Sequence, residues 1–96
     1  MTTLKRNEIR SSLKTKGFVE NNKKDHFYYY LKTKDGIDVG IRTKISRGSR
    51  YREICEPLIH EMARQTKIDK NQFINLVKCP LTKSEYFRIL ENKGLI

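Results

Sequence analysis

Two runs of strand-forming residues flank the pair Asp35-Gly36 near the middle of this chain. The run before it, residues 26–34, is rich in aromatic side chains, and the run after it, residues 37–45, alternates apolar and polar side chains. An Asp-Gly pair favours the tight turn between two antiparallel strands, because glycine adopts positive φ angles without steric cost. The pattern therefore predicts a β-hairpin, and no other local signal in the chain is as strong.

Alternation with a period of two also predicts which side chains share a face of this hairpin. In the second strand the residues expected to face the core are Ile37, Val39, Ile41, Thr43 and Ile45, and those expected to face outward are Asp38, Gly40, Arg42 and Lys44. In the first strand the corresponding sets are Phe27, Tyr29, Leu31 and Thr33, and then Tyr28, Tyr30 and Lys32. One face of the sheet should thus be apolar and the other basic.

A helix is expected before the hairpin, over residues 3–16, because Leu4, Ile9 and Leu13 lie on one helical stripe. Thr3 is its expected N-cap, and Gly17 is the expected stop. A short strand begins at residues 18–19, and the polar residues 21–25 form the turn that leads into the hairpin. The other faces of the helix are basic, which fits a solvated surface and a nucleic-acid-facing surface equally well; they carry Lys5, Arg6, Arg10, Lys14 and Lys16.

Three further helices are expected after the hairpin. Pro57 suits the first turn of a helix over residues 56–66, whose inward stripe is Leu58, Ile59, Met62 and Ala63. Asp69 caps the next helix, Thr82 and Glu85 form a capping box for the last one, and Gly94 ends it. The expected fold is α+β: a helix, a three-stranded antiparallel sheet and a helix over residues 1–68, followed by two short helices over residues 69–96 that pack on the same domain.

The chain has 96 residues, with 21 Lys and Arg against 11 Asp and Glu, which leaves a net charge of +10. A chain of this length buries one core, so a multidomain enzyme is excluded. No segment is long and apolar enough to cross a membrane, and residues 1–20 lack the apolar centre of a signal peptide. We therefore expect a cytoplasmic protein that does not act at a membrane.

The chain has two cysteines and two histidines, and they are scattered singly: Cys55, Cys79, His26 and His60. Neither the spacing of a zinc site nor the density of a disulfide scaffold is present. We expect reduced core thiols, no metal and no cofactor.

Residues 46–52 form a basic segment rich in Gly and Ser between the hairpin and the next helix. Such a segment can bring backbone N–H groups and Arg side chains to a phosphate. Basic loops are also common on any protein with this charge, but the basic strand that leads into it favours the phosphate interpretation. The candidate RNA-binding residues are Lys5, Arg6, Lys23, Lys24, Tyr28, Tyr30, Arg42, Lys44, Arg47, Arg50 and Arg52.

The order helix, three strands, helix, the string Lys14-Thr15-Lys16-Gly17-Phe18 and a single histidine at the beginning of the second strand resemble the HicA toxin family. The resemblance covers roughly residues 4–66 and does not include the C-terminal helices. It implies a fold like the double-stranded RNA-binding domain, activity as an mRNA interferase, His26 as the catalytic residue and a HicB antitoxin as partner. The chain departs from the family at Lys24-Asp25, where Gly and Ser or Thr usually precede the histidine, and in its tail over residues 67–96.

Three functions follow as hypotheses. The first is a small RNA-binding protein that recognises structured or double-stranded RNA mainly through phosphate contacts, with Tyr28 and Tyr30 stacking on bases or only stabilising cross-strand pairs. The second is a metal-independent ribonuclease, in which His26 takes the proton from a ribose 2′-hydroxyl and a second group, such as Tyr28, Lys24 or an arginine, supplies the acid.

The third hypothesis is DNA binding or protein interaction through the C-terminal helices, including oligomer formation. The apolar residues that would form such a face are Phe73, Ile74, Tyr86, Phe87 and Leu90. Apolar stripes on helices are more often part of the core.

Overall fold

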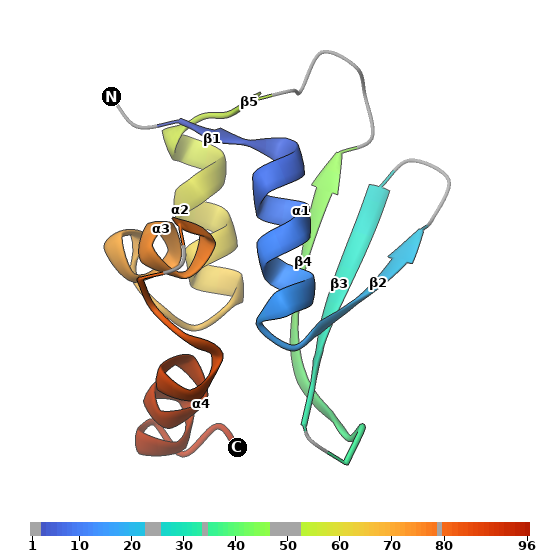
Figure 1. The fold of residues 1–96 in the computed structure, drawn as a ribbon, viewed down its shortest axis with the longest axis vertical. Helices are drawn as coiled ribbons and strands as arrows, with labels where there is room; N and C mark the ends of the chain where they lie inside the picture. The colour runs from blue at the N-terminus through green and yellow to red at the C-terminus, as the bar shows by residue number, and fades with distance from the viewer. Residues whose placement is uncertain (1–2, 23–25, 34, 47–52, 79) are drawn as a thin grey trace.

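The computed structural model of the protein describes residues 3–22, 26–33, 35–46, 53–78 and 80–96. Its elements in chain order are β1 (Leu4–Lys5), α1 (Arg6–Thr15), β2 (Phe18–Asn22), β3 (His26–Lys32), β4 (Asp38–Ser46), β5 (Glu53–Ile54), α2 (Glu56–Gln65), α3 (Lys70–Lys78) and α4 (Lys83–Asn92), as Figure 1 shows. The predicted α+β class is confirmed.

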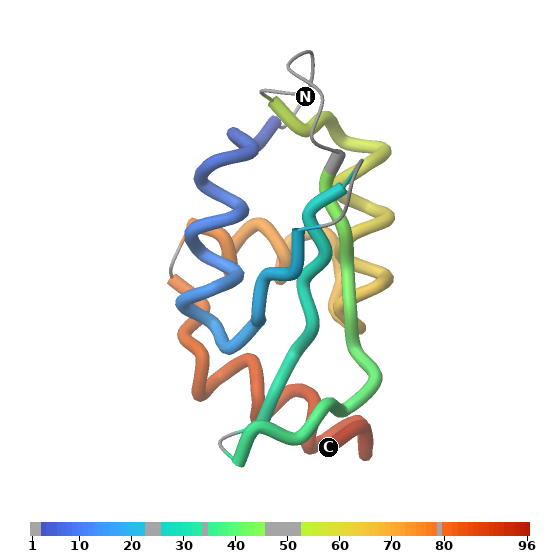
Figure 2. The backbone as a smooth tube through the Cα atoms, turned by 90° about the vertical axis from the view of Figure 1, so that its right-hand side faces the viewer, coloured from blue at the N-terminus to red at the C-terminus, as the bar shows by residue number. Residues whose placement is uncertain are grey.

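Strands β2, β3 and β4 form an antiparallel sheet in that order, and β1 pairs with β5 in a separate two-stranded sheet. Helices α1 and α2 lie on one side of the three-stranded sheet, and α3 packs against both of them (Figure 1). Figure 2 shows the sheet from its other side, where no helix of the described chain lies over it. We call this side the outer face.

The hairpin of β3 and β4 is confirmed. Gly36 has φ +78° and its N–H donates to the carbonyl of Thr33 at 2.9 Å, which closes the turn. The register pairs Tyr28 with Lys44 and Tyr30 with Arg42, but then shifts so that Lys32 pairs with Asp38.

This shift corrects the predicted start of the second strand. At the shift, Gly40 has φ +80° and its N–H donates to Asp38 Oδ1 at 2.8 Å, so β4 bulges there. Ile37 precedes β4 and is 60% exposed, so it does not face the core as expected, and Val39 is only partly buried. A bulge interrupts strict alternation, which is why the pattern failed at this end.

Of the remaining residues expected to face inward, Thr33 follows the end of β3 and is only partly buried, and the others behave as the alternation predicts. Phe27, Tyr29 and Leu31 on β3 are buried, as are Ile41, Thr43 and Ile45 on β4. They pack in one hydrophobic core with residues of all four helices, including Ile9, Ile59, Phe73 and Leu90.

The apolar stripes of the C-terminal helices contribute to this core. Phe73, Tyr86 and Leu90 are completely buried, and Ile74 and Phe87 pack partly against the core. The Tyr86 hydroxyl donates to the carbonyl of Thr66 at 2.8 Å, and its ring stacks with that of Phe18 at 6.0 Å between centroids. Of the two alternatives for these residues, an interaction face or part of the core, the structure shows the core.

The start of the first helix also differs from the prediction. Thr3 is not its N-cap, because Leu4 and Lys5 are extended and pair with Ile54 and Glu53, and α1 begins only at Arg6. Leu4 and Ile54 are both buried, so pairing with a distant strand prevails over helix propensity here. The stop at Gly17 is confirmed by φ +105°.

Two details of α2 and its flanks need correction. Leu58 is 44% exposed, because the buried stripe of α2 consists of Ile59, Met62 and Ala63. Cys55 is exposed at the N-cap and is therefore not a core thiol, and Cys79 lies outside the described residues.

The caps of α3 and α4 are confirmed. Asp69 Oδ1 accepts from the N–H of Gln72 at 2.7 Å, and Gln72 Oε1 accepts from the N–H of Asp69 at 3.1 Å. Thr82 and Glu85 form a reciprocal capping box at α4. Within the described residues, no helix has both the length and the apolar character needed to cross a membrane.

Candidate nucleic-acid interface

The outer face is built from two cross-strand rows and a histidine. The first row runs from Val19 on β2 through Tyr30 on β3 to Arg42 on β4. The second row runs from Asn21 through Tyr28 to Lys44, and His26 precedes Tyr28 by two residues at the beginning of β3. The sequence prediction that Tyr28, Tyr30, Arg42 and Lys44 share one face is thus confirmed.

The aromatic side chains of β3 form a continuous line along this face. The ring centroids of His26 and Tyr28 are 5.9 Å apart with planes at 48°, and those of Tyr28 and Tyr30 are 6.4 Å apart with planes at 21°. All three side chains are partly exposed. We call these three residues the aromatic row.

The cations beside the aromatic row have no carboxylate partner in the part of the chain that the structure describes. Arg42 and Lys44 are exposed, and neither forms an ion pair or a hydrogen bond with any residue of the described chain. Because neither cation is neutralised, both side chains can contact an anion without first giving up a bond.

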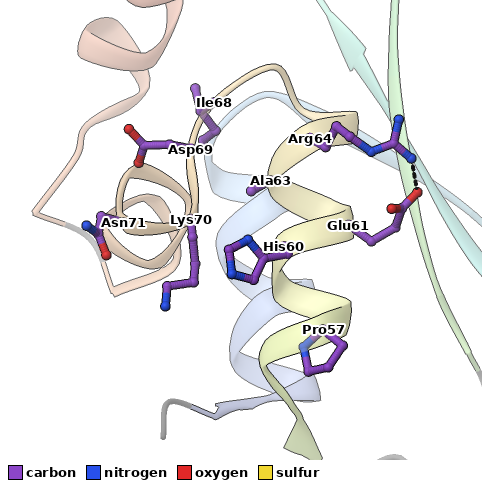
Figure 3. Close-up of a pocket in the computed structure, with 9 residues that line it drawn as sticks. All are labelled: Pro57, His60, Glu61, Ala63, Arg64, Ile68, Asp69, Lys70 and Asn71. Carbon is purple, nitrogen blue, oxygen red and sulfur yellow. Dashed lines mark hydrogen bonds and ion pairs between the residues drawn. The ribbon is translucent and has the colours of Figure 1, made fainter.

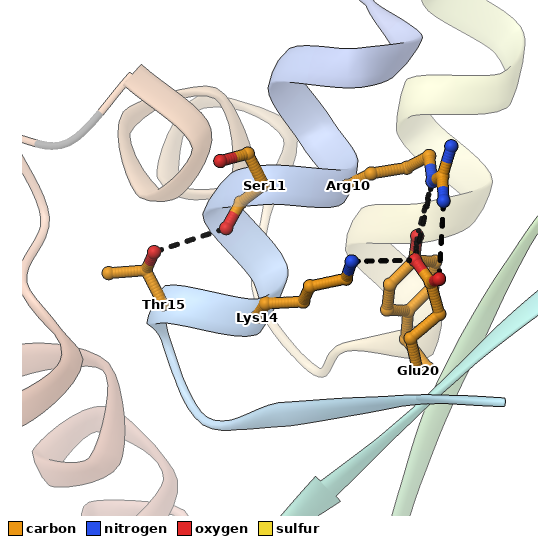
Figure 4. Close-up of polar contacts among 6 residues, drawn as sticks. Arg10, Ser11, Lys14, Thr15 and Glu20 are labelled. Atoms are coloured by element: carbon orange, nitrogen blue, oxygen red, sulfur yellow. Dashed lines mark hydrogen bonds and ion pairs between the residues drawn. The ribbon is translucent and has the colours of Figure 1, made fainter.

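Two basic residues of α1, unlike Arg42 and Lys44, pair with a carboxylate. Arg10 donates to both carboxylate oxygens of Glu20, at 3.3 and 3.2 Å, and Lys14 lies 3.4 Å from the same carboxylate, as Figure 4 shows. Arg10 also lies 3.8 Å from the ring centroid of Phe27. These contacts tie the two cations to the sheet, so the expected basic face of α1 is largely neutralised.

Tyr29 completes this cluster from the inner side of β3. Its hydroxyl donates to Glu20 Oε2 at 2.5 Å and accepts from Arg10 Nε at 3.1 Å. Burial raises the pKa of Tyr29 well above its ordinary value. Burial also acts to raise the pKa of Glu20, but hydrogen bonds from Arg10 and Tyr29 outweigh it and leave that pKa below its ordinary value. The hydrogen bond to Glu20 raises the pKa of Arg10.

Lys16, at the end of α1, is removed from solvent altogether. It is 4% exposed, and its Nζ donates to the carbonyl of Leu81 at 2.5 Å. The expectation that it belongs to a basic surface is therefore wrong, because its ammonium group satisfies a backbone carbonyl of the C-terminal region.

Two of the other sequence-predicted RNA-binding residues are described, Lys5 and Arg6, and neither lies on the outer face. Lys5 is exposed on β1 and Arg6 is partly buried at the beginning of α1, so both belong to the region of the two-stranded sheet. The remaining five lie outside the described residues: Lys23, Lys24, Arg47, Arg50 and Arg52.

His26 lies in a hollow of about 320 Å³ between the beginning of β3, the edge strand β4 and α2. The polar side chains that line it with His26 are those of Lys44, Glu61 and Gln65. Thr43 Oγ1 donates to Gln65 Oε1 at 2.6 Å, and Gln65 Nε2 donates to Glu61 Oε1 at 3.4 Å, so Gln65 links β4 to Glu61.

Sequence reasoning did not place Glu61 and Gln65 near His26. Their spacing of four residues predicts that both side chains lie on one side of α2. Which strand that side of the helix meets is a property of the packing, so the spacing alone did not assign them to a site.

A larger hollow, of about 700 Å³, lies between α2 and the beginning of α3 (Figure 3). His60 projects into it from α2, as Figure 3 shows, and Lys70 on its far side forms an ion pair with Glu56 at 2.5 Å. No group of three His, Cys, Asp or Glu side chains with the geometry of a metal site occurs among the described residues. This hollow therefore offers no clear chemistry.

Comparison of the chain with models of protein families, with curated protein sequences and with solved structures found no match in any of the three. The functional argument therefore rests on the geometry of the outer face and of the hollow beside it.

Proposed function

We propose that this protein is a cytoplasmic RNA-binding protein, and that it contacts the phosphates of structured RNA with the outer face of its sheet. The observation that carries the proposal is that Arg42 and Lys44, on a face that no described helix covers, have no carboxylate partner among the described residues. They stand beside exposed aromatic rings in a chain of net charge +10.

The physical basis is the release of counterions from the RNA. Each cation that neutralises a phosphate releases condensed ions, so affinity falls as salt rises, with a slope set by the number of contacts. An unpaired cation contributes this gain directly, whereas a paired cation must exchange its carboxylate for the phosphate.

The test is a titration of the double variant Arg42→Ala/Lys44→Ala into a labelled RNA hairpin at several salt concentrations. We expect weaker binding, and a slope of log affinity against log salt that is shallower by about 1.4–1.8 for two lost contacts. The matched control is Arg64→Ala/Lys70→Ala, which removes two ion-paired cations from α2 and α3 and should leave the slope nearly unchanged. An unchanged slope in the first variant would exclude the outer face.

A second candidate function is metal-independent RNA cleavage of the kind that the HicA resemblance implies, with an antitoxin protein as the regulating partner. It is favoured by one observation, the hollow in which His26 lies with Lys44 and Glu61. His26 would take the proton of the ribose 2′-hydroxyl as that oxygen bonds to phosphorus. The bond between phosphorus and the 5′ oxygen of the leaving nucleotide then breaks, and this oxygen takes a proton from an acid or from water. Lys44 would offset the negative charge on the phosphate oxygens.

Incubation of the protein with RNA in EDTA, followed by a denaturing gel, tests this function. Cleavage should disappear in His26→Ala and persist in His60→Ala, which removes an exposed histidine from α2. Intact RNA with the wild-type protein over a range of pH would contradict the enzymatic function and leave RNA binding in place.

A further inference from the structure

We infer that the aromatic row His26, Tyr28 and Tyr30 binds unpaired nucleotides, whose bases stack on the rings while their phosphates lie over Arg42 and Lys44. This inference rests on the proposed RNA binding and specifies the class of RNA that the outer face accepts: single-stranded segments, such as the loops of a structured RNA.

The spacing of the rings is the first argument. Neighbouring centroids in the row are 5.9 and 6.4 Å apart, whereas bases within a duplex are about 3.4 Å apart along each strand. Bases that contact successive rings must therefore be separated from one another. A paired and stacked strand cannot adopt this spacing, but an extended single strand can.

The second argument is the register between β3 and β4. Lys44 lies directly opposite Tyr28, and Arg42 lies directly opposite Tyr30. Side chains of directly opposed residues start about 5 Å apart at their Cβ atoms. The face thus repeats a unit of one aromatic ring and one cation, and a nucleotide consists of one planar base and one phosphate.

The third argument concerns the other flank of the row. Val19 and Asn21 on β2 lie opposite Tyr30 and Tyr28, and both are exposed and uncharged. The two cross-strand rows therefore contain cations on one side, rings in the middle and no carboxylate. This arrangement directs a phosphate backbone toward β4, and the Asn21 amide can pair with the edge of a stacked base.

The tyrosines of the aromatic row differ from their buried neighbour in their hydrogen bonds to the described residues. The neighbouring Tyr29 is fully buried and hydrogen-bonded to Glu20, whereas the hydroxyls of Tyr28 and Tyr30 make no hydrogen bond to any described residue. Stacking on bases uses the ring and not the hydroxyl. The rings of Tyr28 and Tyr30 can therefore stack on bases without the loss of a hydrogen bond to a described residue.

The experiment compares two probes by fluorescence anisotropy in EDTA: a labelled single-stranded RNA of mixed sequence, and the same strand annealed to its complement. Tyr28→Leu and Tyr30→Leu should each weaken binding of the single strand by roughly 5- to 150-fold, and Tyr28→Phe and Tyr30→Phe should keep it. Duplex binding should change little in all four. The control Phe87→Leu, which alters an aromatic residue paired with Lys83 on α4, should affect neither probe.

A second measurement requires no variant. The chain has five tyrosines and no tryptophan, so its intrinsic fluorescence is that of tyrosine, and Tyr28 and Tyr30 of the aromatic row contribute to it. Titration with unlabelled single-stranded RNA should quench this fluorescence, and titration with the duplex should quench it less.

The outcomes separate the inference from the proposed function. If the protein binds RNA with a salt-dependent affinity but prefers the duplex, or if the leucine variants bind both probes as the wild type does, the inference is overturned and phosphate binding stands. If neither probe binds, both fail. Selective loss of the single strand in folded leucine variants supports the inference.

Discussion

Several basic residues on the helical side of the sheet make contacts that Arg42 and Lys44 on the outer face do not make. On the helical side Arg10 and Lys14 share Glu20, Lys70 pairs with Glu56, and Lys16 donates to a backbone carbonyl. On the outer face Arg42 and Lys44 have no carboxylate partner in the described chain. The comparison teaches that a net charge of +10 does not locate an interface, because much of the positive charge is already engaged in holding the fold together.

The tyrosines show a similar contrast between a buried position, Tyr86, and a position on the outer face, Tyr28. Replacing each by alanine gives the largest expected difference in stability. Tyr86→Ala should lower the free energy of unfolding by about 3–5 kcal/mol, because it empties a fully buried site and leaves the Thr66 carbonyl without its donor. Tyr28→Ala should cost less than about 1 kcal/mol, since the ring lies on an open face.

Urea unfolding followed by circular dichroism measures both variants. Tyr86→Phe keeps the ring and removes the hydroxyl, so its free energy of unfolding should lie between those of the two alanine variants. It gives a measurable value even if Tyr86→Ala does not fold. Equal destabilisation by Tyr28→Ala and Tyr86→Ala would show that the aromatic row is part of the packing and would remove the contrast.

The cluster of Arg10, Glu20 and Tyr29 gives the next largest effect. Glu20→Gln should lower the free energy of unfolding by about 1–3 kcal/mol, because it removes a charged acceptor from two hydrogen-bond donors. RNA affinity should not fall, since the cluster lies on the helical side of the sheet.

The same variant should alter the dependence of stability on pH. The pKa of Glu20 is lowered in the folded state, so its contribution is complete above the ordinary glutamate pKa and is lost as the pH falls through the lowered value. The free energy of unfolding, measured from neutral to acidic pH, should therefore change less with pH in Glu20→Gln than in the wild type. A variant that loses stability with acid as steeply as the wild type would contradict the assignment.

The smallest expected effect comes from releasing a paired cation. Hydrogen bonding to Lys70 lowers the pKa of the partly exposed Glu56 carboxyl, and Glu56→Gln would leave Lys70 without this partner. We expect little change in stability and a slight gain in RNA affinity, with a salt slope steeper by less than one phosphate contact. Titration of the RNA hairpin shows whether pairing with carboxylates is what keeps cations on the helical side from contacting RNA. A gain in affinity as large as the loss in Arg42→Ala/Lys44→Ala would show that pairing is not the only factor.

Much of the fold could be read from local pattern. The faces of β3 and most of β4 follow from alternation, and the caps at Asp69 and Thr82 follow from side chains that bond to a backbone N–H three residues away. Prediction failed at Leu4, which pairs with Ile54, and at Ile37, where a bulge displaces the strand. Neither the distant partner nor the bulge is encoded within a short window of residues.

The candidate site was predicted in part for the same reason. Tyr28, Tyr30, Arg42 and Lys44 were assigned to one face because a strand places alternate residues on the same side, whatever else the chain does. Glu61 and Gln65 joined His26 only through the packing of α2 against the edge of the sheet. The expected basic face of α1 is partly neutralised because Glu20 reaches Arg10 and Lys14 from β2.

From the sequence alone come the hairpin, the helix caps and the composition of the outer face, since each depends on residues that are neighbours in the chain. The tertiary structure alone decides which cations remain available, because Glu20, Glu56 and the Leu81 carbonyl reach their partners across separations of 10, 14 and 65 residues. Charge is a property of composition, whereas its neutralisation depends on distances of a few ångströms, and these exist only once the chain has folded.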